Sequence, residues 1–407
     1  MTKRVLLLTQ WFDPEPTFKG LLFAKELVKR GFDVEVVTGF PNYPGGVVYD
    51  GYKIKLIQRE MIDGVKITRL PLYPSHNSSA IKRVVNFMSF AMSALFYNLL
   101  FLKKVDVIYA YHPPLTIGVV AVITRFFRRT PVVYDIQDMW PDTLKATGML
   151  NNERLLGVIS WVAKWVYKRV DQIVVLSPGF KRLLVKRGVS PFKIDVIPNW
   201  CDEPSLSVTI PPKDLSVMQD KRLKIVFAGN MGKAQALETI MNAAYQLQEL
   251  KLDVVFYMIG GGLELEKLKN LSAENELFNM VFIPQMPMSE VGWYLKKADV
   301  LLVHLRKDPL FSITIPSKIQ AYMFLGKPIL MGVEGDASDI VSKAGSGVLF
   351  EPESTESLVM AIQLLLRKNR DELCEYGEKS QEYYLDFLSL HSGVDRFSKI
   401  FETISRK

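Results

Sequence analysis

The chain has 407 residues, of which 48% are hydrophobic and 23% are charged. This length exceeds that of one ordinary doubly wound domain and suits two, and the composition excludes a largely disordered chain. The two cysteines, Cys201 and Cys374, form no paired motif with each other or with a histidine. This argues against a disulfide framework or a zinc site.

The net charge of +8 is unevenly distributed along the chain. Residues 1–204 contain 28 Lys and Arg against 17 Asp and Glu, whereas the remainder contains 23 against 26. A basic half joined to a mildly acidic half predicts that the first half meets an anionic surface or ligand. No signature of a nucleic-acid-binding module accompanies the charge, so we expect no nucleic-acid partner and favour anionic lipid.

Strand and helix patterns alternate along the first half. Short apolar runs predict strands, and apolar residues three and four positions apart predict helices. The predicted strands are 5–8, 34–37, 105–109, 131–134 and 172–176, and the predicted helices are 20–30 and 180–187. The alternation indicates a parallel sheet with helical crossovers.

The second half repeats the scheme. Its predicted strands are 224–228, 253–259, 300–304 and 328–331, and its predicted helices are 237–250, 263–271 and 317–325. The fold class is therefore α/β, with two Rossmann-like parallel-sheet domains at 1–204 and 205–380. The join lies near 205–222, where prolines and charges interrupt the periodicity. Residues 381–407 read as a C-terminal helix with the option of returning to the first domain.

Residues 84–102 form an uncharged apolar stretch with two basic residues on each side. Its polar residues recur at helical spacing and so form one narrow stripe: Asn86, Ser89, Ser93 and Tyr97. The pattern favours a helix that lies in a membrane interface with its basic ends on lipid phosphates. The alternatives are a core helix of the first domain and, less favoured, a bilayer span.

Three strand ends in the second half carry a glycine-rich or basic loop. Each loop alone could be a purely structural turn, but the carboxyl ends of parallel strands share one edge of a sheet, so the loops should converge. Backbone N–H groups and lysines there suit a diphosphate. We also expect Ser317 to cap the following helix and Gly326 to end it. The predicted diphosphate-binding residues are Gly229, Asn230, Gly232, Lys233, Gly260, Gly261, Gly262, Ile315, Pro316, Ser317, Lys318 and Gln320.

The strand ends of the first half carry aromatic residues mixed with Asn, Asp and His. Such loops are typical of sugar recognition, because rings stack on apolar sugar faces and polar groups bind hydroxyls; the alternative is ordinary proline-rich connections. The predicted sugar-binding residues are Lys19, Gly20, Asn42, Tyr43, His112 and Trp140. We predict catalytic roles for Asp138, Lys233 and Lys318. No Asp-x-Asp pair occurs, so we predict no metal site. If the ligand is a sugar nucleotide, the two lysines and helix N-termini would stabilise the leaving diphosphate.

Six motifs together resemble glycosyltransferase family 4, and the match spans nearly the whole chain. They are GFPNYP (39–44), DMWP (138–141), VIPNW (196–200), GNMGK (229–233), PSKIQAYM (316–323) and GKP (326–328). The resemblance implies a GT-B fold, in which two Rossmann-like domains face each other across a cleft. The branch that looks most similar is that of bacterial O-antigen and capsule N-acetyl-L-fucosamine transferases.

The resemblance further implies a retaining, metal-independent transfer from a UDP-sugar, without a cofactor. The diphosphate-binding residues of the second domain would then be the donor-binding residues, and the sugar-binding residues of the first domain would be the acceptor-binding residues. The acceptor would be a saccharide on undecaprenyl diphosphate, which places the enzyme peripherally on the cytoplasmic face of the bacterial cell membrane.

The chain departs from the family pattern at several positions. Many members carry two glutamates where this chain has Ile313 and Ala321, a histidine near Gln137 and Asp138, and an arginine in place of Asn230. Two other functions therefore remain: a catalytically degenerate nucleotide-sugar-binding protein or membrane adaptor, and a UDP-sugar epimerase.

Overall fold

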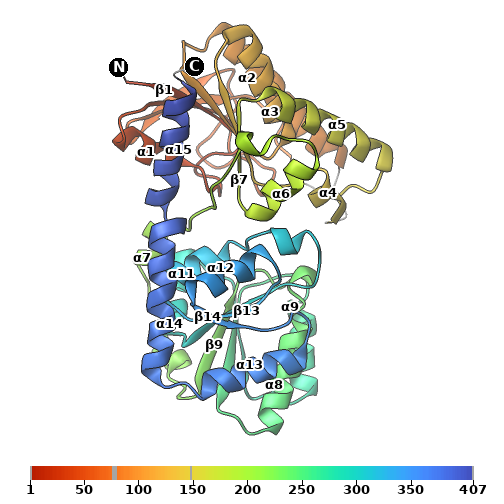
Figure 1. The fold of residues 1–407 in the computed structure, drawn as a ribbon, viewed down its shortest axis with the longest axis vertical. Helices are drawn as coiled ribbons and strands as arrows, with labels where there is room; N and C mark the ends of the chain where they lie inside the picture. Colours follow the sequence, from red (N-terminus) through yellow and green to blue (C-terminus); the bar gives the residue numbers. More distant parts are fainter. Residues whose placement is uncertain (1, 76–79, 147–148, 406–407) are drawn as a thin grey trace. The chain divides into compact units, whose positions relative to one another are not determined.

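The computed structural model describes residues 2–75, 80–146 and 149–405, and the chain forms two compact units (Figure 1). The first unit comprises Met1–Pro198 and Gly393–Lys407, and the second comprises Asn199–Ser392. The sequence divided the chain at 204 and 380. In the structure the chain enters the second unit after Pro198 and re-enters the first at Gly393.

The first unit is built on an eight-stranded sheet in the order β3-β4-β2-β1-β5-β6-β7-β8. All neighbouring strands are parallel except β3 and β4. The central strands are buried along most of their length, which is why they read as continuous apolar runs. The strands are β1 (Arg4–Leu8), β2 (Asp33–Gly39), β3 (Gln58–Ile62), β4 (Val65–Leu70), β5 (Val107–His112), β6 (Val132–Ile136), β7 (Gln172–Val175) and β8 (Ile194–Val196).

The sequence analysis missed the antiparallel hairpin at the edge of this sheet. Strand β3 alternates between half-buried and exposed residues and carries three polar ones, so it lacks an apolar run. The turn carries a recognisable signal, because Asp63 and Gly64 have φ angles of 49° and 84°. Positive φ at both central positions is the requirement of a type I′ turn, which Asp-Gly meets.

Helices cover both faces of this sheet. On one face, Gly118 of α3 packs directly against Tyr134 of β6 and Val166 of α5. On the other, Phe397 of the last helix lies 5.2 Å from Phe23 and 5.5 Å from Tyr109 between ring centres, so the end of the chain is part of the first unit. The helices are α1 (Leu21–Lys29), α2 (Ala80–Leu100), α3 (Leu115–Arg128), α4 (Asp142–Ala146), α5 (Glu153–Arg169), α6 (Pro178–Lys186) and α15 (Leu390–Ile404), with a 3-10 turn at Pro191–Lys193.

The second unit is built on a six-stranded, fully parallel sheet in the order β11-β10-β9-β12-β13-β14. The strands are β9 (Leu223–Ala228), β10 (Val254–Ile259), β11 (Met280–Ile283), β12 (Val300–His304), β13 (Ile329–Gly332) and β14 (Gly347–Leu349). The short outer strands β11 and β14 are absent from the sequence prediction, since three or four residues are too few to show a period.

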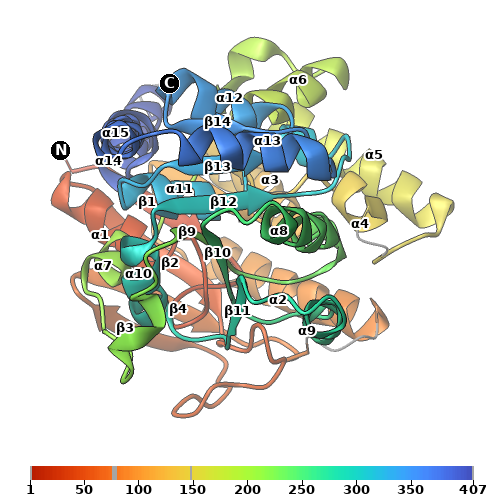
Figure 2. The same ribbon diagram turned by 90° about the horizontal axis from the view of Figure 1, so that it is seen from below.

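Two apolar cores flank the second sheet (Figure 2). Helices α8, α9 and α13 contribute to the core on one face, and α7, α10, α11 and α12 to the core on the other. The helices are α7 (Glu203–Ser207), α8 (Glu238–Glu249), α9 (Leu265–Glu274), α10 (Met288–Lys297), α11 (Lys318–Phe324), α12 (Asp336–Ala344), α13 (Thr355–Leu366) and α14 (Arg370–Tyr383), with 3-10 turns at Leu215–Met218, Lys233–Gln235 and Phe311–Ile313 and a π turn at Tyr384–Leu388.

The apolar stretch predicted at 84–102 is helix α2, and its polar stripe faces the interior of the first unit. The Asn86 side chain is buried, accepts a hydrogen bond from Gln10 at 2.6 Å and donates one to the carbonyl of Tyr73 at 2.7 Å. The buried Tyr97 hydroxyl donates to Glu35 at 3.3 Å. Within the described residues, no helix combines the length and the hydropathy that crossing a bilayer requires.

Candidate functional site

The loops after β9 and β10 interlock through their backbones at the carboxyl edge of the second sheet. Gly229 N–H donates to the carbonyl of Ile259 at 2.9 Å, and Met231 N–H donates to that of Gly261 at 2.7 Å. A Cβ on Gly260 would lie 2.1 Å from the Gly229 oxygen, and one on Gly262 would lie 2.4 Å from the Met231 oxygen. Gly260 and Gly262 are thus required by the neighbouring loop, whereas the sequence analysis assigned them to close approach of a ligand.

Lys318 brings a cation to this pair of loops. It begins α11, and its Nζ lies 3.4 Å from the point where a Cβ on Gly229 would stand. The nitrogen is buried and has no hydrogen-bond acceptor among the described residues. Burial lowers the pKa of Lys318 to about 7. The contact that offsets part of this cost is the Phe227 ring, whose centre is 3.7 Å from Nζ.

The other predicted donor residues are exposed, half-buried or buried, and Gly232 and Pro316 are half-buried. Gly229, Asn230, Lys233 and Ser317 are exposed, and so are free to meet a ligand. Ile315 is buried. Gln320 is also buried, and in the amide orientation that satisfies its surroundings its nitrogen donates to the carbonyls of Pro316 at 3.1 Å and Ser317 at 2.9 Å.

Two further predictions concern the ends of helix α11. The expected capping hydrogen bond from Ser317 is not formed. Gly326, with a φ of +63°, ends the segment as predicted.

His304, at the end of β12, is a structural tie. Its ring lies between the carbonyl of Gln235, 2.8 Å from Nδ1, and the N–H of Glu353, 3.0 Å from Nε2. Burial lowers the pKa of His304 to about 4, so the neutral ring can donate to one group and accept from the other. It therefore joins three loops at the same edge of the sheet.

A row of aromatic rings crosses the carboxyl edge of the first sheet. Trp11 stacks on Tyr43 at 4.6 Å between ring centres and meets Phe87 of α2 at 6.4 Å. Phe87 then lies 6.2 Å from Trp140, which contacts His112 edge-on at 5.3 Å. All but His112 are partly exposed. Tyr43, His112 and Trp140 are predicted acceptor residues that the fold brings together, whereas Trp11 and Phe87 were missed.

Glu15 holds two of these strand-end loops together. One carboxylate oxygen accepts the N–H groups of Asn42 and Tyr43, both at 2.8 Å, and the other accepts that of Phe12 at 3.1 Å. Burial raises the pKa of Glu15 to about 7 despite these hydrogen bonds. The sequence analysis did not single out this residue, because a glutamate in a loop reads as solvent-exposed.

The predicted residues Lys19 and Asn42 are buried in the first unit. Burial lowers the pKa of Lys19 to about 8, and the charge of the nearby Asp135 opposes this shift. Asp135 in turn accepts the Tyr109 hydroxyl at 2.5 Å and the Gln137 amide at 2.6 Å. Asn42 donates to the carbonyl of Phe40. Both side chains organise the loops, whereas the prediction placed them in contact with the acceptor.

Gly20, His112 and Asp138 complete the predicted set in the first unit. A Cβ on Gly20 would lie 2.0 Å from the Asp13 carboxylate, so this glycine is a close-packing position. His112 is buried, its Nδ1 lacks a hydrogen-bond partner among the described residues, and burial lowers its pKa to about 3. Burial raises the pKa of Asp138, the predicted catalytic carboxylate, which is partly exposed.

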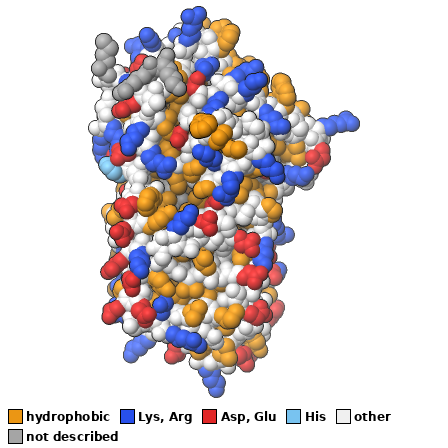
Figure 3. Space-filling model, viewed as in Figure 1, with side chains coloured by type: hydrophobic (Ala, Val, Ile, Leu, Met, Phe, Trp, Pro, Cys, Tyr) orange, Lys and Arg blue, Asp and Glu red, His pale blue; other side chains and the backbone are white. Residues whose placement is uncertain are grey.

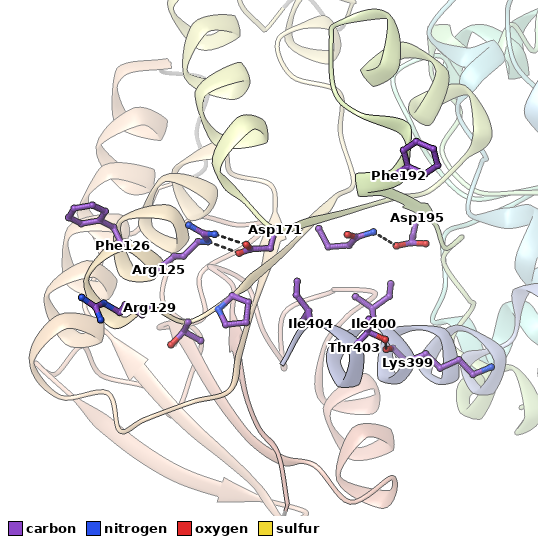
Figure 4. Close-up of a pocket in the computed structure, with 13 residues that line it drawn as sticks. Arg125, Phe126, Arg129, Asp171, Phe192, Asp195, Lys399, Ile400, Thr403 and Ile404 are labelled. Carbon is purple, nitrogen blue, oxygen red and sulfur yellow. Dashed lines mark hydrogen bonds and ion pairs between the residues drawn. The ribbon is translucent and has the colours of Figure 1, made fainter. Parts of the chain in front are cut away.

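A cavity of about 850 Å³ lies at the opposite edge of the first sheet, where β6 and β7 begin (Figure 4). Its charged groups are largely paired: Arg125 binds Asp171 at 2.5 Å, and Gln172 donates to Asp195 at 2.6 Å. None of the predicted site residues lines this cavity. It is therefore separate from the loops described above.

Two parallel α/β units with ligand-suited loops at the carboxyl edges of their sheets define a nucleotide-binding class of fold. Comparisons with known proteins give the family. Residues 21–200 match the model of the glycosyl transferase 4-like domain, and residues 214–382 match that of glycosyl transferases group 1. The chain thus belongs to the glycosyltransferases of the GT-B fold.

Individual relatives agree with this assignment. The chain is 26% identical over 378 residues to WcaI of Escherichia coli (strain K12), which is named as a colanic acid biosynthesis glycosyl transferase; the match covers 87% of this chain and 89% of that protein. Sucrose-phosphate synthase from Thermosynechococcus elongatus has a similar structure, with a TM-score of 0.73, 16% identity and 99% of both chains covered. The structure of HepE of Anabaena, solved with UDP-glucose, is also similar, with a TM-score of 0.67 and 13% identity; the match covers 98% of this chain and 99% of that one.

Proposed function

We propose that this glycosyltransferase binds a UDP-sugar at the interlocked loops of the second unit. The observation that carries the proposal is the buried Nζ of Lys318, which lacks an acceptor among the described residues and lies beside Gly229. An anionic phosphate placed there would supply the missing acceptor and raise the pKa of the lysine. The similar HepE structure with UDP-glucose supports a nucleotide diphosphate as the ligand.

The acceptor is proposed to bind at the aromatic row of the first unit. Stacked rings with buried polar neighbours suit a saccharide, and the relative WcaI is named for biosynthesis of a polysaccharide. From the motif resemblance, the donor is UDP-N-acetyl-L-fucosamine and the acceptor is a saccharide on undecaprenyl diphosphate in O-antigen or capsule assembly. The protein would then work on the cytoplasmic face of the membrane.

The proposed reaction is a retaining transfer in which the leaving diphosphate acts as the base. The bond between the anomeric carbon and the β-phosphate oxygen breaks, and the acceptor oxygen forms a bond to the same face of that carbon. The acceptor proton passes to the β-phosphate. Lys318 and Lys233 stabilise the negative charge that develops on the diphosphate, so the reaction needs neither a strong protein base nor a metal.

The two positions where many family members have glutamate suggest the principal rival. Ala321 is buried in an apolar core of the second unit, and Ile313 lies in the turn Phe311–Ile313. Neither side chain can form a hydrogen bond to a ribose or sugar hydroxyl. The alternative function is therefore binding of the donor without turnover.

Calorimetry with UDP tests the donor site. Wild-type protein should bind UDP with a micromolar dissociation constant, and Lys233→Ala/Lys318→Ala should lose that binding while remaining folded. A folded wild-type protein that does not bind UDP would refute the donor assignment. Incubation with UDP-N-acetyl-L-fucosamine and a lipid-linked saccharide then separates the rivals: transfer supports the enzyme, donor binding without transfer supports the degenerate protein, and conversion of the donor without an acceptor supports an epimerase.

A further inference from the structure

Helix α2 has an inverted arrangement of its two faces. Its polar stripe packs on the sheet and takes part in buried hydrogen bonds, as described for Asn86 and Tyr97. Its opposite face is apolar and exposed, with Met92 at 68% and Phe96 at 63% of their full exposure. An ordinary surface helix has the reverse arrangement: its apolar stripe packs against the core, and its polar face is exposed to water.

The exposed apolar side chains form one continuous stripe along α2 that extends onto α3. The C-terminal ends of the two helices lie side by side, because the Arg128 guanidinium donates to the carbonyls of Asn98 at 2.9 Å and Leu102 at 2.8 Å. Figure 3 shows hydrophobic side chains interspersed with Lys and Arg in this part of the molecule. The α2–α3 face consists of Ile81, Val84, Val85, Met88, Met92, Phe96, Leu100, Phe101, Phe126 and Phe127.

The charge around the α2–α3 face is almost entirely positive. Between residues 80 and 130, which include α2 and α3, there are seven Lys and Arg and a single acidic residue, Asp106. Of the seven, Arg125 is paired with Asp171. The Asp106 carboxylate accepts the backbone N–H of Arg4 at 2.7 Å, on the neighbouring strand. Lys103, Lys104 and Arg129 are exposed near the C-terminal ends of the two helices. A partner for this face must therefore be both apolar and anionic.

We propose that the α2–α3 face docks on the surface of a bilayer that contains anionic phospholipid. The apolar stripe would enter the boundary between headgroups and acyl chains, and the lysines and arginines would meet the lipid phosphates. A water-soluble protein partner would also cover the apolar stripe, but a predominantly basic rim matches a uniformly anionic surface better. Monomeric soluble proteins seldom expose a contiguous apolar patch that extends along a whole helix, as the α2–α3 face does.

The same helix connects the docking face to the proposed acceptor site. Phe87 belongs to the aromatic row, and Met88, the next residue of α2, belongs to the docking face. A docked helix would thus hold the row of rings close to the lipid headgroups. This last step rests on the proposed function, whereas docking itself does not depend on it.

Flotation with lipid vesicles tests the proposal. Full-length protein should float with vesicles of equal parts phosphatidylcholine and phosphatidylglycerol and stay in solution with phosphatidylcholine alone. Met92→Ser/Phe96→Ser should weaken binding more than about tenfold, because each side chain loses its burial in lipid. Lys103→Ala/Lys104→Ala should weaken it about fivefold per lysine. No nucleotide is needed, so failure here is distinct from failure of UDP binding.

Met360→Ser/Phe278→Ser provides the matched control, because these exposed residues, of the same types, lie in the second unit. This variant should float like wild type, and circular dichroism should show that all variants remain folded. Flotation that survives Met92→Ser/Phe96→Ser would overturn the proposal. So would a stable dimer in light scattering that this variant converts to a monomer without any wild-type vesicle binding, since the face would then join two copies of the chain.

Discussion

The ammonium nitrogen of Lys318 lies 3.7 Å from the centre of the Phe227 ring and has no hydrogen-bond acceptor among the described residues. Burying a cation in this way is costly, and an aromatic face returns only part of the lost hydration. The buried nitrogen lies next to Gly229, at the loops proposed to hold a diphosphate. A binding site that is unfavourable when empty should trade stability for affinity.

Lys318→Met should therefore stabilise the protein while it weakens UDP binding. We expect a gain of about 1–3 kcal/mol in the free energy of unfolding at pH 7, seen as a raised Tm in calorimetry, and a loss of UDP affinity of roughly 10- to 100-fold. The folded pKa of about 7 is below the ordinary 10.5. The wild type thus gains stability as pH rises from 7 to 10.5, and the advantage of the variant should shrink over the same range.

Lys379→Met is the control for this substitution, because Lys379 is exposed and pairs with Glu375 four residues earlier on α14. Its effect on stability should stay within about 0.5 kcal/mol, and its UDP affinity should be unchanged. A Lys318→Met protein that is less stable than wild type would contradict the claim that the buried charge is unfavourable.

UDP binding should take up a proton above pH 7. The free protein holds Lys318 at a pKa of about 7, and a bound diphosphate would raise that pKa, so the lysine must be protonated on binding. The affinity should fall as pH rises above 7, by up to about tenfold per unit. Calorimetry at pH 8 in two buffers of different ionisation enthalpy measures the uptake, which should vanish in Lys318→Met. Equal heats in both buffers for the wild type would argue against this.

Two adjacent glycines should differ sharply in their tolerance of alanine. Gly260 has a φ of +134° and a Cβ there would meet the Gly229 oxygen at 2.1 Å, whereas the nearest atom to a Cβ on Gly261 is 3.5 Å away. Gly260→Ala should cost on the order of 2 kcal/mol or more of stability and weaken UDP binding by displacing the Gly229 loop. Gly261→Ala should change both quantities little. Thermal unfolding and UDP calorimetry compare the pair, and equal effects would refute the interlocked-loop explanation.

The aromatic row should contribute to acceptor binding alone. Trp11 stacks on Tyr43, so Trp11→Ala should raise the KM for the saccharide acceptor about 5- to 30-fold, as expected for a lost stacking contact of about 1–2 kcal/mol. UDP affinity should remain as in wild type. Phe192→Ala, at a ring that is 95% exposed beside the cavity at the opposite edge of the sheet, is the control. A change in UDP affinity with unchanged KM would place Trp11 elsewhere in the reaction.

The buried strands and the glycine loops were readable from the sequence. Strands such as β5 and β10 are rich in apolar and aromatic residues and buried throughout, because both faces of a parallel sheet are covered. Residues 229–233 and 260–262 were recognised as turns. The reason for their glycines was not recognised, because the two loops pack against each other and are distant in sequence. Edge strands such as β3 were not predicted, because alternate residues are exposed to water and no apolar run forms.

The sequence by itself determined that the chain has two α/β domains, that basic charge gathers in the first half, and that α2 is a helix with one polar stripe. The tertiary structure decided which side of α2 meets the sheet, that the Lys318 Nζ is buried while Lys233 is exposed, and that Trp11 and Phe87 join one row of rings. The physical reason is that periodicity is local and records which residues share a face. Whether that face meets protein, water or a ligand depends on neighbours that only the folded chain brings near.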